Sequence, residues 1–173
     1  MEHVAFLRNV NQGQRGQPST ADIVAAFGAA GASDIRTFQS NGTVVCASST
    51  PDDVGDRVPE HLATSSGFGA LVFTRELVFI EQVVERHAGA ADFVRHELTL
   101  FAPDAVPADE AELARQASKR RCAVVEHGAG WAVVANDADR QSNGTPTIEA
   151  AAGTPASSRG LPTLLRLVDR FGR

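Results

Sequence analysis

Residues 35–47 read Ile-Arg-Thr-Phe-Gln-Ser-Asn-Gly-Thr-Val-Val-Cys-Ala, and this stretch decides the predicted fold. Both of its ends are rich in residues that favour β-strands. The Ser-Asn-Gly between them is a strong signal for a tight turn. The stretch therefore predicts a β-hairpin, with strands over residues 35–39 and 43–47.

The segments around this hairpin complete one α+β unit. The apolar run at residues 4–7 is typical of a buried strand that enters a polar loop. A helix follows, with Ser19 or Thr20 as its cap and Gly31 as its stop. Thr50, as a capping hydroxyl, opens a second helix that runs to about residue 65, and residues 70–74 form a further strand. The order strand, helix, strand, strand, helix, strand is ferredoxin-like.

The second half of the chain repeats this order approximately. Its expected elements are a connecting helix at 76–87, a strand at 93–101, a helix at 107–119, a hairpin of 122–125 and 131–134, and a short helix at 147–152. An apolar stripe then marks a C-terminal amphipathic helix. We therefore expect an α+β fold of two ferredoxin-like βαββαβ-type halves, related by pseudo-duplication, with subdomains at residues 1–75 and 76–173.

The composition indicates a folded protein. The chain has 173 residues, and its 43% of hydrophobic residues can build an ordinary core. Its apolar stretches fall far short of the roughly 20 residues that cross a bilayer, and no targeting segment precedes them, so we expect a cytoplasmic protein without a membrane partner. The net charge of -5 argues against a protein that coats long duplexes. A monomer or a homodimer is expected.

The loop after the first strand contains candidate binding residues. Arg8 can hold a phosphate or carboxylate group through its planar guanidinium, and Asn11 and the backbone of Gly13 can add donors. A salt bridge or contacts to carbonyl groups that pin the loop would explain Arg8 equally well. In the hairpin turn, Gln39 and Ser40 are not required for turn formation and are therefore further candidates. Asn-Gly at the next two positions is better explained by turn chemistry.

A third candidate group lies near the C-terminus. We expect Ser157, Ser158 and Arg159 to stand where the last helix begins, where free backbone amides, hydroxyls and a guanidinium can form an anion site. Capping by serine would explain the hydroxyls as well. The candidate ligand-binding residues are therefore Arg8, Asn11, Gly13, Gln39, Ser40 and Arg159.

The sequence identifies no catalytic residue and no cofactor. Its five histidines form no His-Glu-x-x-His motif and accompany no Cys-x-x-Cys pair, so no metal site is expected. Cys46 and Cys122 lie in strand-like segments, where reduced core thiols are the expected state.

Three segments carry a resemblance to a known family. Residues 6–13 read F-L-R-N-V-N-Q-G and correspond to a family motif L-R-G-I-N-V-G-G, and residues 36–46 correspond to R-T-Y-x-Q-S-G-N-V-V-F. Residues 157–164 are similar to T-T-R-N-W-N-T-V. The chain thus resembles the bacterial domain-of-unknown-function family 1697, although one motif glycine is Gln12 and the Asn-Trp-Asn triplet is missing. The resemblance implies a duplicated α+β fold and a candidate surface, but no reaction.

Three kinds of function are consistent with these residues. The first is binding of a small anionic ligand or of single-stranded nucleic acid such as RNA by the candidate residues. The aromatic content of 6% weakens the RNA version, because base stacking needs exposed rings, which Phe6 and Phe38 would supply only if they point outward. The alternatives are an enzyme that acts on a phosphorylated or acylated metabolite, and a structural or dimerising module.

Overall fold

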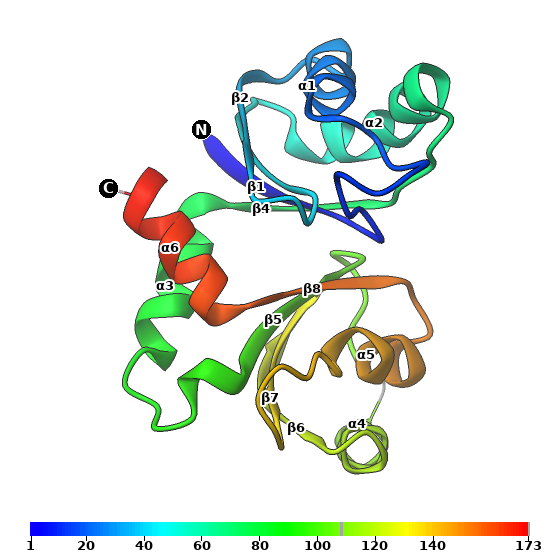
Figure 1. Cartoon of the computed structure of the whole chain (residues 1–173). Coiled ribbons are helices and arrows are strands. Elements are labelled where there is room, and N and C mark those ends of the chain that lie inside the picture. Colours follow the sequence, from blue (N-terminus) through cyan, green and yellow to red (C-terminus); the bar gives the residue numbers. More distant parts are fainter. Residues whose placement is uncertain (108, 173) are drawn as a thin grey trace. The chain divides into compact units, whose positions relative to one another are not determined.

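The computed structural model describes residues 1–107 and 109–172. The chain forms two compact units, Met1–Ile80 and Glu81–Arg173. The boundary between them falls inside helix α3 (Leu77–His87), which is drawn in green in Figure 1. The subdomain limits expected from the sequence, 1–75 and 76–173, stay a prediction.

The first unit contains one four-stranded sheet and two helices. Its elements are β1 (Glu2–Leu7), α1 (Thr20–Ala29), β2 (Ser33–Phe38), β3 (Thr43–Ala47), α2 (Pro51–Ser66) and β4 (Val72–Glu76). The strands lie in the order β2-β3-β1-β4, and all neighbours are antiparallel. This is the split arrangement of the ferredoxin-like fold, with both helices on one face of the sheet (Figure 1).

Local signals explain how the helices of this unit begin. Ser19 caps α1 through a capping box, in which its Oγ accepts from the Asp22 N–H at 3.1 Å and the Asp22 carboxylate accepts from the Ser19 N–H at 2.8 Å. The expectation for Thr50 was wrong in one respect, because its side chain makes no capping hydrogen bond to α2. Pro51 in the first turn and two acidic residues behind it favour that helix start instead.

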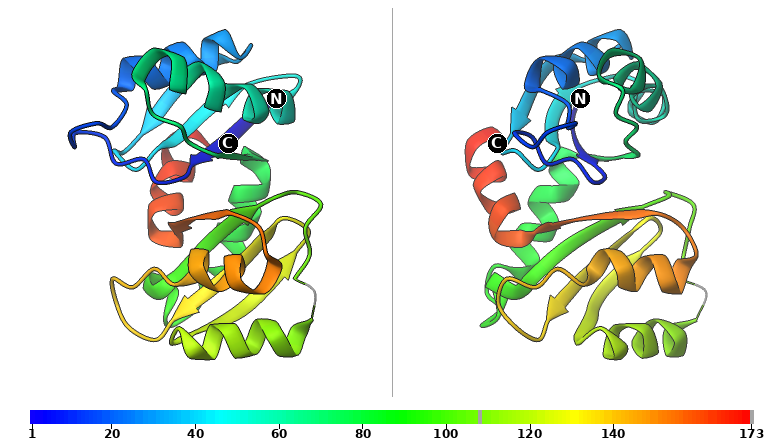
Figure 2. Two further views of the ribbon diagram at one scale, coloured as in Figure 1. Left: turned by 90° about the vertical axis from the view of Figure 1, so that its right-hand side faces the viewer. Right: turned by 45° about the vertical axis from the view of Figure 1, so that its right-hand side comes forward.

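The second unit repeats the same topology. Its elements after α3 are a 3-10 turn (Phe93–Arg95), β5 (His96–Phe101), α4 (Glu110–Lys119), β6 (Cys122–Gly128), β7 (Trp131–Asn136), α5 (Gly144–Ala152), β8 (Ala156–Gly160) and α6 (Leu161–Phe171). The strand order is β6-β7-β5-β8, again with antiparallel neighbours. Helices α4 and α5 cover one face of this sheet (Figure 2). The predicted pseudo-duplication with a C-terminal helix is confirmed.

Two expectations for this unit need correction. Residues 93–95 form the 3-10 turn and not the start of a strand. The last strand of the second half, β8, lies where the start of the C-terminal helix was expected, because its residues Ala-Ser-Ser-Arg-Gly include no β-branched or aromatic residue that would indicate a strand. It forms because β5 offers it a backbone partner over residues 97–101, and it completes the second βαββαβ unit.

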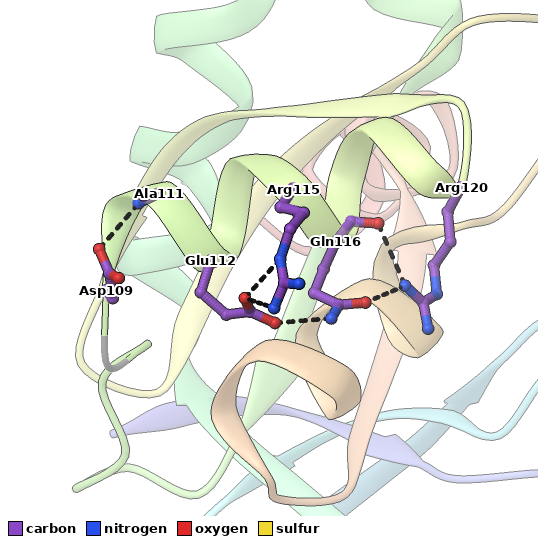
Figure 3. A network of polar contacts seen from close by, with 6 residues as sticks. All are labelled: Asp109, Ala111, Glu112, Arg115, Gln116 and Arg120. Carbon is purple, nitrogen blue, oxygen red and sulfur yellow. Dashed lines mark hydrogen bonds and ion pairs between the residues drawn. The ribbon is translucent and has the colours of Figure 1, made fainter.

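Helix α4 illustrates how an exposed helix face is stabilised (Figure 3). Asp109 caps it by accepting from the Ala111 N–H at 2.9 Å. Along the same face Glu112 pairs with Arg115 and accepts from Gln116 Nε2 at 2.6 Å. Such pairs support a helix without forming a binding site. None of the helices in the described ranges is long and apolar enough to span a membrane.

Candidate functional site

In the first unit, the loop after β1 is joined to the hairpin turn. The Gln12 backbone N–H donates to the Ser40 carbonyl at 2.7 Å. In the amide orientation that gives both the nitrogen and the oxygen a hydrogen-bond partner, the Gln12 carboxamide donates to the Gln39 carbonyl at 3.2 Å and accepts from the Thr20 N–H at 3.1 Å. The loop, the turn and the start of α1 therefore form one continuous polar surface.

The candidate residues of this unit differ in their exposure. Asn11, Gly13, Gln39 and Ser40 are exposed, and Arg8 is half-buried. The Arg8 backbone N–H donates to the Leu71 carbonyl at 2.8 Å, which fixes its main chain beside β4. The structure thus brings five of the six predicted residues onto neighbouring loops, while their role in binding stays a prediction.

Gly42 and Gly13 at this surface differ in the space that a side chain would have there. Gly42 has a φ of +70°, and a Cβ there would stand 2.7 Å from Val10 Cβ and 2.9 Å from Leu7 Cβ, so no larger residue fits. Gly13 has a φ of +90° and open space around the position of a Cβ. Gly42 therefore packs the turn against the loop, whereas Gly13 leaves its backbone uncovered.

The expectation for Ser157, Ser158 and Arg159 was wrong about their position. These residues belong to β8, and α6 begins at Leu161, so they do not stand at a helix N-terminus. The Arg159 side chain is buried, with its Nη1 donating to Ser157 Oγ at 3.0 Å and to the Ser158 carbonyl at 2.7 Å. Burial lowers the pKa of the Arg159 guanidinium to about 10. Its participation in ligand binding stays a prediction.

Sequence reasoning missed a buried carboxylate in the second unit. Glu97 on β5 is only 3% exposed. Its Oε1 accepts from the Gly144 backbone N–H at 2.6 Å and from Asn136 Nδ2 at 3.1 Å, and its Oε2 accepts from Ser142 Oγ at 2.6 Å. The carboxylate thereby caps α5 from a neighbouring strand, since the N-cap residue Asn143 makes no side-chain capping bond.

Three hydroxyl groups near this carboxylate form a line of hydrogen bonds. Thr99 Oγ1 lies 2.8 Å from Ser158 Oγ, which in turn lies 2.7 Å from Thr145 Oγ1. A Cβ on Gly144 would stand 2.3 Å from Thr99 Oγ1 and 3.1 Å from Ser158 Oγ, so this position admits only glycine. Ser158 therefore has a structural partner across the sheet.

The two cysteines are free and buried. Burial raises the pKa of the Cys46 thiol to about 11, against a smaller opposing effect of Arg36. Burial also raises the pKa of Cys122, whose Sγ lies 3.3 Å from Thr147 Oγ1. Both are therefore neutral thiols near pH 7. No group of three or more metal-ligating side chains occurs in residues 1–107 and 109–172.

Comparison with known proteins identifies the family of the chain and a solved structure with the same fold. A family model described as a protein of unknown function, DUF1697, matches residues 1–131. The chain belongs to this family. No curated protein matches the chain. Among solved structures, the DUF1697 chain is similar to the conserved bacterial protein SP0830 from Streptococcus pneumoniae, with a TM-score of 0.62, 97% of each chain covered and 10% sequence identity. At this identity the likeness shows the fold alone.

The DUF1697 match contains the loop after β1, the hairpin turn and Glu97, and it ends at the first residue of β7. The partners of Glu97 on β7 and at the start of α5 lie beyond it. One sequence signal could have found Glu97 itself. In the strand His-Glu-Leu-Thr-Leu-Phe, Phe101 belongs to the core under α4 and α5, so Glu97 and Thr99 share its face. Two polar residues on a buried face indicate a polar network.

Proposed function

We propose that this protein binds a small anionic molecule at a surface of its first unit, which we name the loop–turn surface. Its residues are Arg8, Asn11, Gly13, Gln39 and Ser40. The observation that supports the proposal most directly is the 2.7 Å hydrogen bond from the Gln12 N–H to the Ser40 carbonyl. Because of this bond, two polar segments that are separated by a helix and a strand lie on one surface.

The chemistry of these groups suits an oxyanion. A guanidinium binds phosphate or carboxylate through two parallel N–H donors, and the partial burial of Arg8 reduces screening by salt. Gly13 has open space where a side chain would stand, so an anion can approach the backbone amides of this loop. Gln39 and Ser40 add an exposed amide and an exposed hydroxyl.

A small anion fits this surface better than single-stranded RNA does. Phe6 and Phe38, the rings considered for base stacking, are 0% and 7% exposed. Indeed, no aromatic side chain in the described part of the chain is exposed. Stacking on aromatic rings supplies much of the binding energy for single strands. A ligand held mainly by charge and hydrogen bonds is therefore the better match.

A matched pair of arginine variants tests the proposal. Arg15 lies in the same loop as Arg8 and is exposed, so Arg15→Ala removes the same charge without touching the loop–turn surface. We expect glycerol phosphate to shift the amide NMR signals of residues 8–13 and 39–42 in the full chain. Arg8→Ala should weaken this binding about tenfold, and Arg15→Ala should leave it unchanged.

The alternatives give different results in the same experiment. Equal losses in both variants would mean that diffuse positive charge, and not a built site, attracts the anion. The absence of shifts in these residues would contradict the proposal and favour a structural module. Release of inorganic phosphate from glycerol phosphate, abolished by Arg8→Ala, would show an enzyme in place of a binding protein.

A further inference from the structure

The second unit contains a pocket of about 300 Å³ beside the beginning of β5. The side chains that matter for its chemistry are Arg95, Arg140, Ser142 and Thr163, while the buried Glu97 and His96 form its inner wall. This volume is at the lower end of the range for small-molecule sites, so an occupant would be a small metabolite. All of these residues belong to the second unit, and none is part of the loop–turn surface.

Two arginines make the entrance of this pocket positive. Arg140 is exposed and has no hydrogen bond or ion pair in the part of the chain that the structure describes. Arg95 is fixed in place, because its Nη1 donates to the Asp137 carbonyl at 2.8 Å and its Nη2 lies 3.9 Å from the Asp92 carboxylate. A guanidinium has five N–H donors, so Arg95 keeps others for a ligand.

The negative charge at the inner wall is already engaged by the protein. Both oxygens of Glu97 accept hydrogen bonds, from the Gly144 N–H, from Asn136 and from Ser142. The pocket also reaches the start of α6, where Gly160 is an N-cap without a capping side chain and Thr163 adds a hydroxyl. The groups left for an occupant are therefore mainly positive charges and hydroxyls.

His96 adds an unmet hydrogen-bonding group to the wall. The side chain is 5% exposed, and its Nε2 lies 3.0 Å from the Asp92 carboxylate. Its Nδ1 is buried and has no hydrogen-bond partner among the described residues. Because Nδ1 is closed off from solvent, His96 shapes the wall of the pocket and is not one of the groups that an occupant meets.

We propose that this pocket is a second ligand site, which takes a small hydroxylated organic anion. The oxyanion, a phosphate or a carboxylate, pairs with Arg140 and Arg95 at the entrance. The hydroxyl groups of the ligand meet the hydroxyls of Ser142 and Thr163, which also line the pocket. Glu97 holds Ser142 and the start of α5 in place.

The test compares four probes on the full chain labelled with ¹⁵N. Glycerol phosphate and malate carry both an oxyanion and a hydroxyl, inorganic phosphate lacks the organic hydroxyl, and glycerol lacks the charge. We expect glycerol phosphate or malate to shift the backbone amide signals of Gln141, Ser142 and Thr163. The probe that binds more tightly shows whether the site prefers a phosphate or a carboxylate. Inorganic phosphate should bind about tenfold more weakly, and glycerol should have no effect.

A matched arginine pair assigns the binding to the pocket. Arg121 is exposed and has a φ of +57°, close to the +62° of Arg140, and it lies outside the pocket lining. Arg140→Ala should weaken binding about tenfold, whereas Arg121→Ala and Arg8→Ala should not change it. Equal losses in Arg140→Ala and Arg121→Ala, no shifts at the three amides, or equal affinity for inorganic phosphate would each overturn the proposal. Loss in Arg8→Ala alone would assign the anion to the loop–turn surface.

Discussion

The carboxylate of Glu97 on strand β5 accepts a hydrogen bond from the backbone N–H of Gly144, the first residue of helix α5, at 2.6 Å. These two residues are 47 positions apart in the sequence. The bond satisfies an amide that a helix start would otherwise leave without a partner. It also gives a buried charge the hydrogen bonds that it needs.

Replacing Glu97 should therefore destabilise the protein strongly. Glu97→Ala leaves the buried Gly144 N–H without its acceptor and removes one acceptor from Asn136 and from Ser142, and we expect a loss of about 2–4 kcal/mol in the free energy of unfolding by urea. Glu97→Gln keeps one carbonyl oxygen and should lose about 1–2 kcal/mol. Glu85→Gln, at an exposed position, is the control and should be neutral. Similar stabilities of Glu97→Ala and Glu85→Gln would refute the capping role.

Gly144 should tolerate no side chain. A Cβ would stand 2.3 Å from Thr99 Oγ1 and 3.0 Å from Glu97 Oε1. Alanine in a helix normally gains about 1 kcal/mol over glycine, but this clash should reverse the sign and give a net loss of about 2 kcal/mol. Gly89→Ala, with nothing within 4 Å of its Cβ, should be neutral or slightly stabilising in the same urea titration. A stabilising Gly144→Ala would mean that the hydroxyl groups move aside without cost.

Gly42 and Gly31 separate backbone strain from crowding. Both have a positive φ, +70° and +98°, so alanine strains the backbone at each. Only at Gly42 would the Cβ also stand 2.7 Å from Val10 Cβ. Gly42→Ala should therefore cost about 1–3 kcal/mol more than Gly31→Ala in the free energy of unfolding. Equal costs would show that the loop can move away from the turn.

The capping box of α1 should make stability depend on pH. Hydrogen bonds from the Ser19 side chain and backbone lower the pKa of Asp22 below its ordinary 3.8. A lowered pKa means that the stabilisation is present above pH 3.8 and is lost as the pH falls through the pKa of the folded state.

The measurement is the thermal midpoint of the wild type minus that of Asp22→Ala, followed from about pH 6 to about pH 2. This difference should shrink over the acidic end of the range. In the Ser19→Ala background the same difference should vary less with pH, because the carboxylate loses the Ser19 hydroxyl and keeps only the backbone N–H as a donor. An unchanged pH dependence in that background would locate its source elsewhere.

Cys46 should be unreactive in the folded protein. The side chain is 1% exposed, and burial raises its pKa from 9.0 to about 11, so the thiolate that reacts with alkylating agents is scarce near pH 8. By the sign of this shift, the thiol contributes stability that is present below pH 9 and is lost as the pH rises towards 11.

Labelling with iodoacetamide, read by mass spectrometry, checks this directly. Cys46 should remain unmodified in the native protein and become modified in urea. Ser49→Cys places a thiol at an exposed position close by and should react quickly. If Cys46 reacts in the native state as fast as the introduced cysteine, the thiol is neither buried nor neutral.

The elements that the sequence determined by itself are those with local physical causes. The Asn41-Gly42 turn and the β-formers on both sides specify β2 and β3 with little help from the rest of the chain. Ser19 sets the start of α1 because its partner Asp22 is three residues away. Hydrophobic periodicity likewise identified the C-terminal helix.

Tertiary structure alone decided strand β8, the cap of α5 and the pocket beside β5. Ala156–Gly160 has no strand preference of its own, and it becomes a strand because β5 supplies hydrogen-bonding partners. Glu97 finds Gly144 only after the sheet has formed, since the two lie far apart in sequence. The physical reason is that local preferences depend on neighbours within a few residues. Long-range backbone pairing and the burial of polar groups depend on which distant segments the fold brings together.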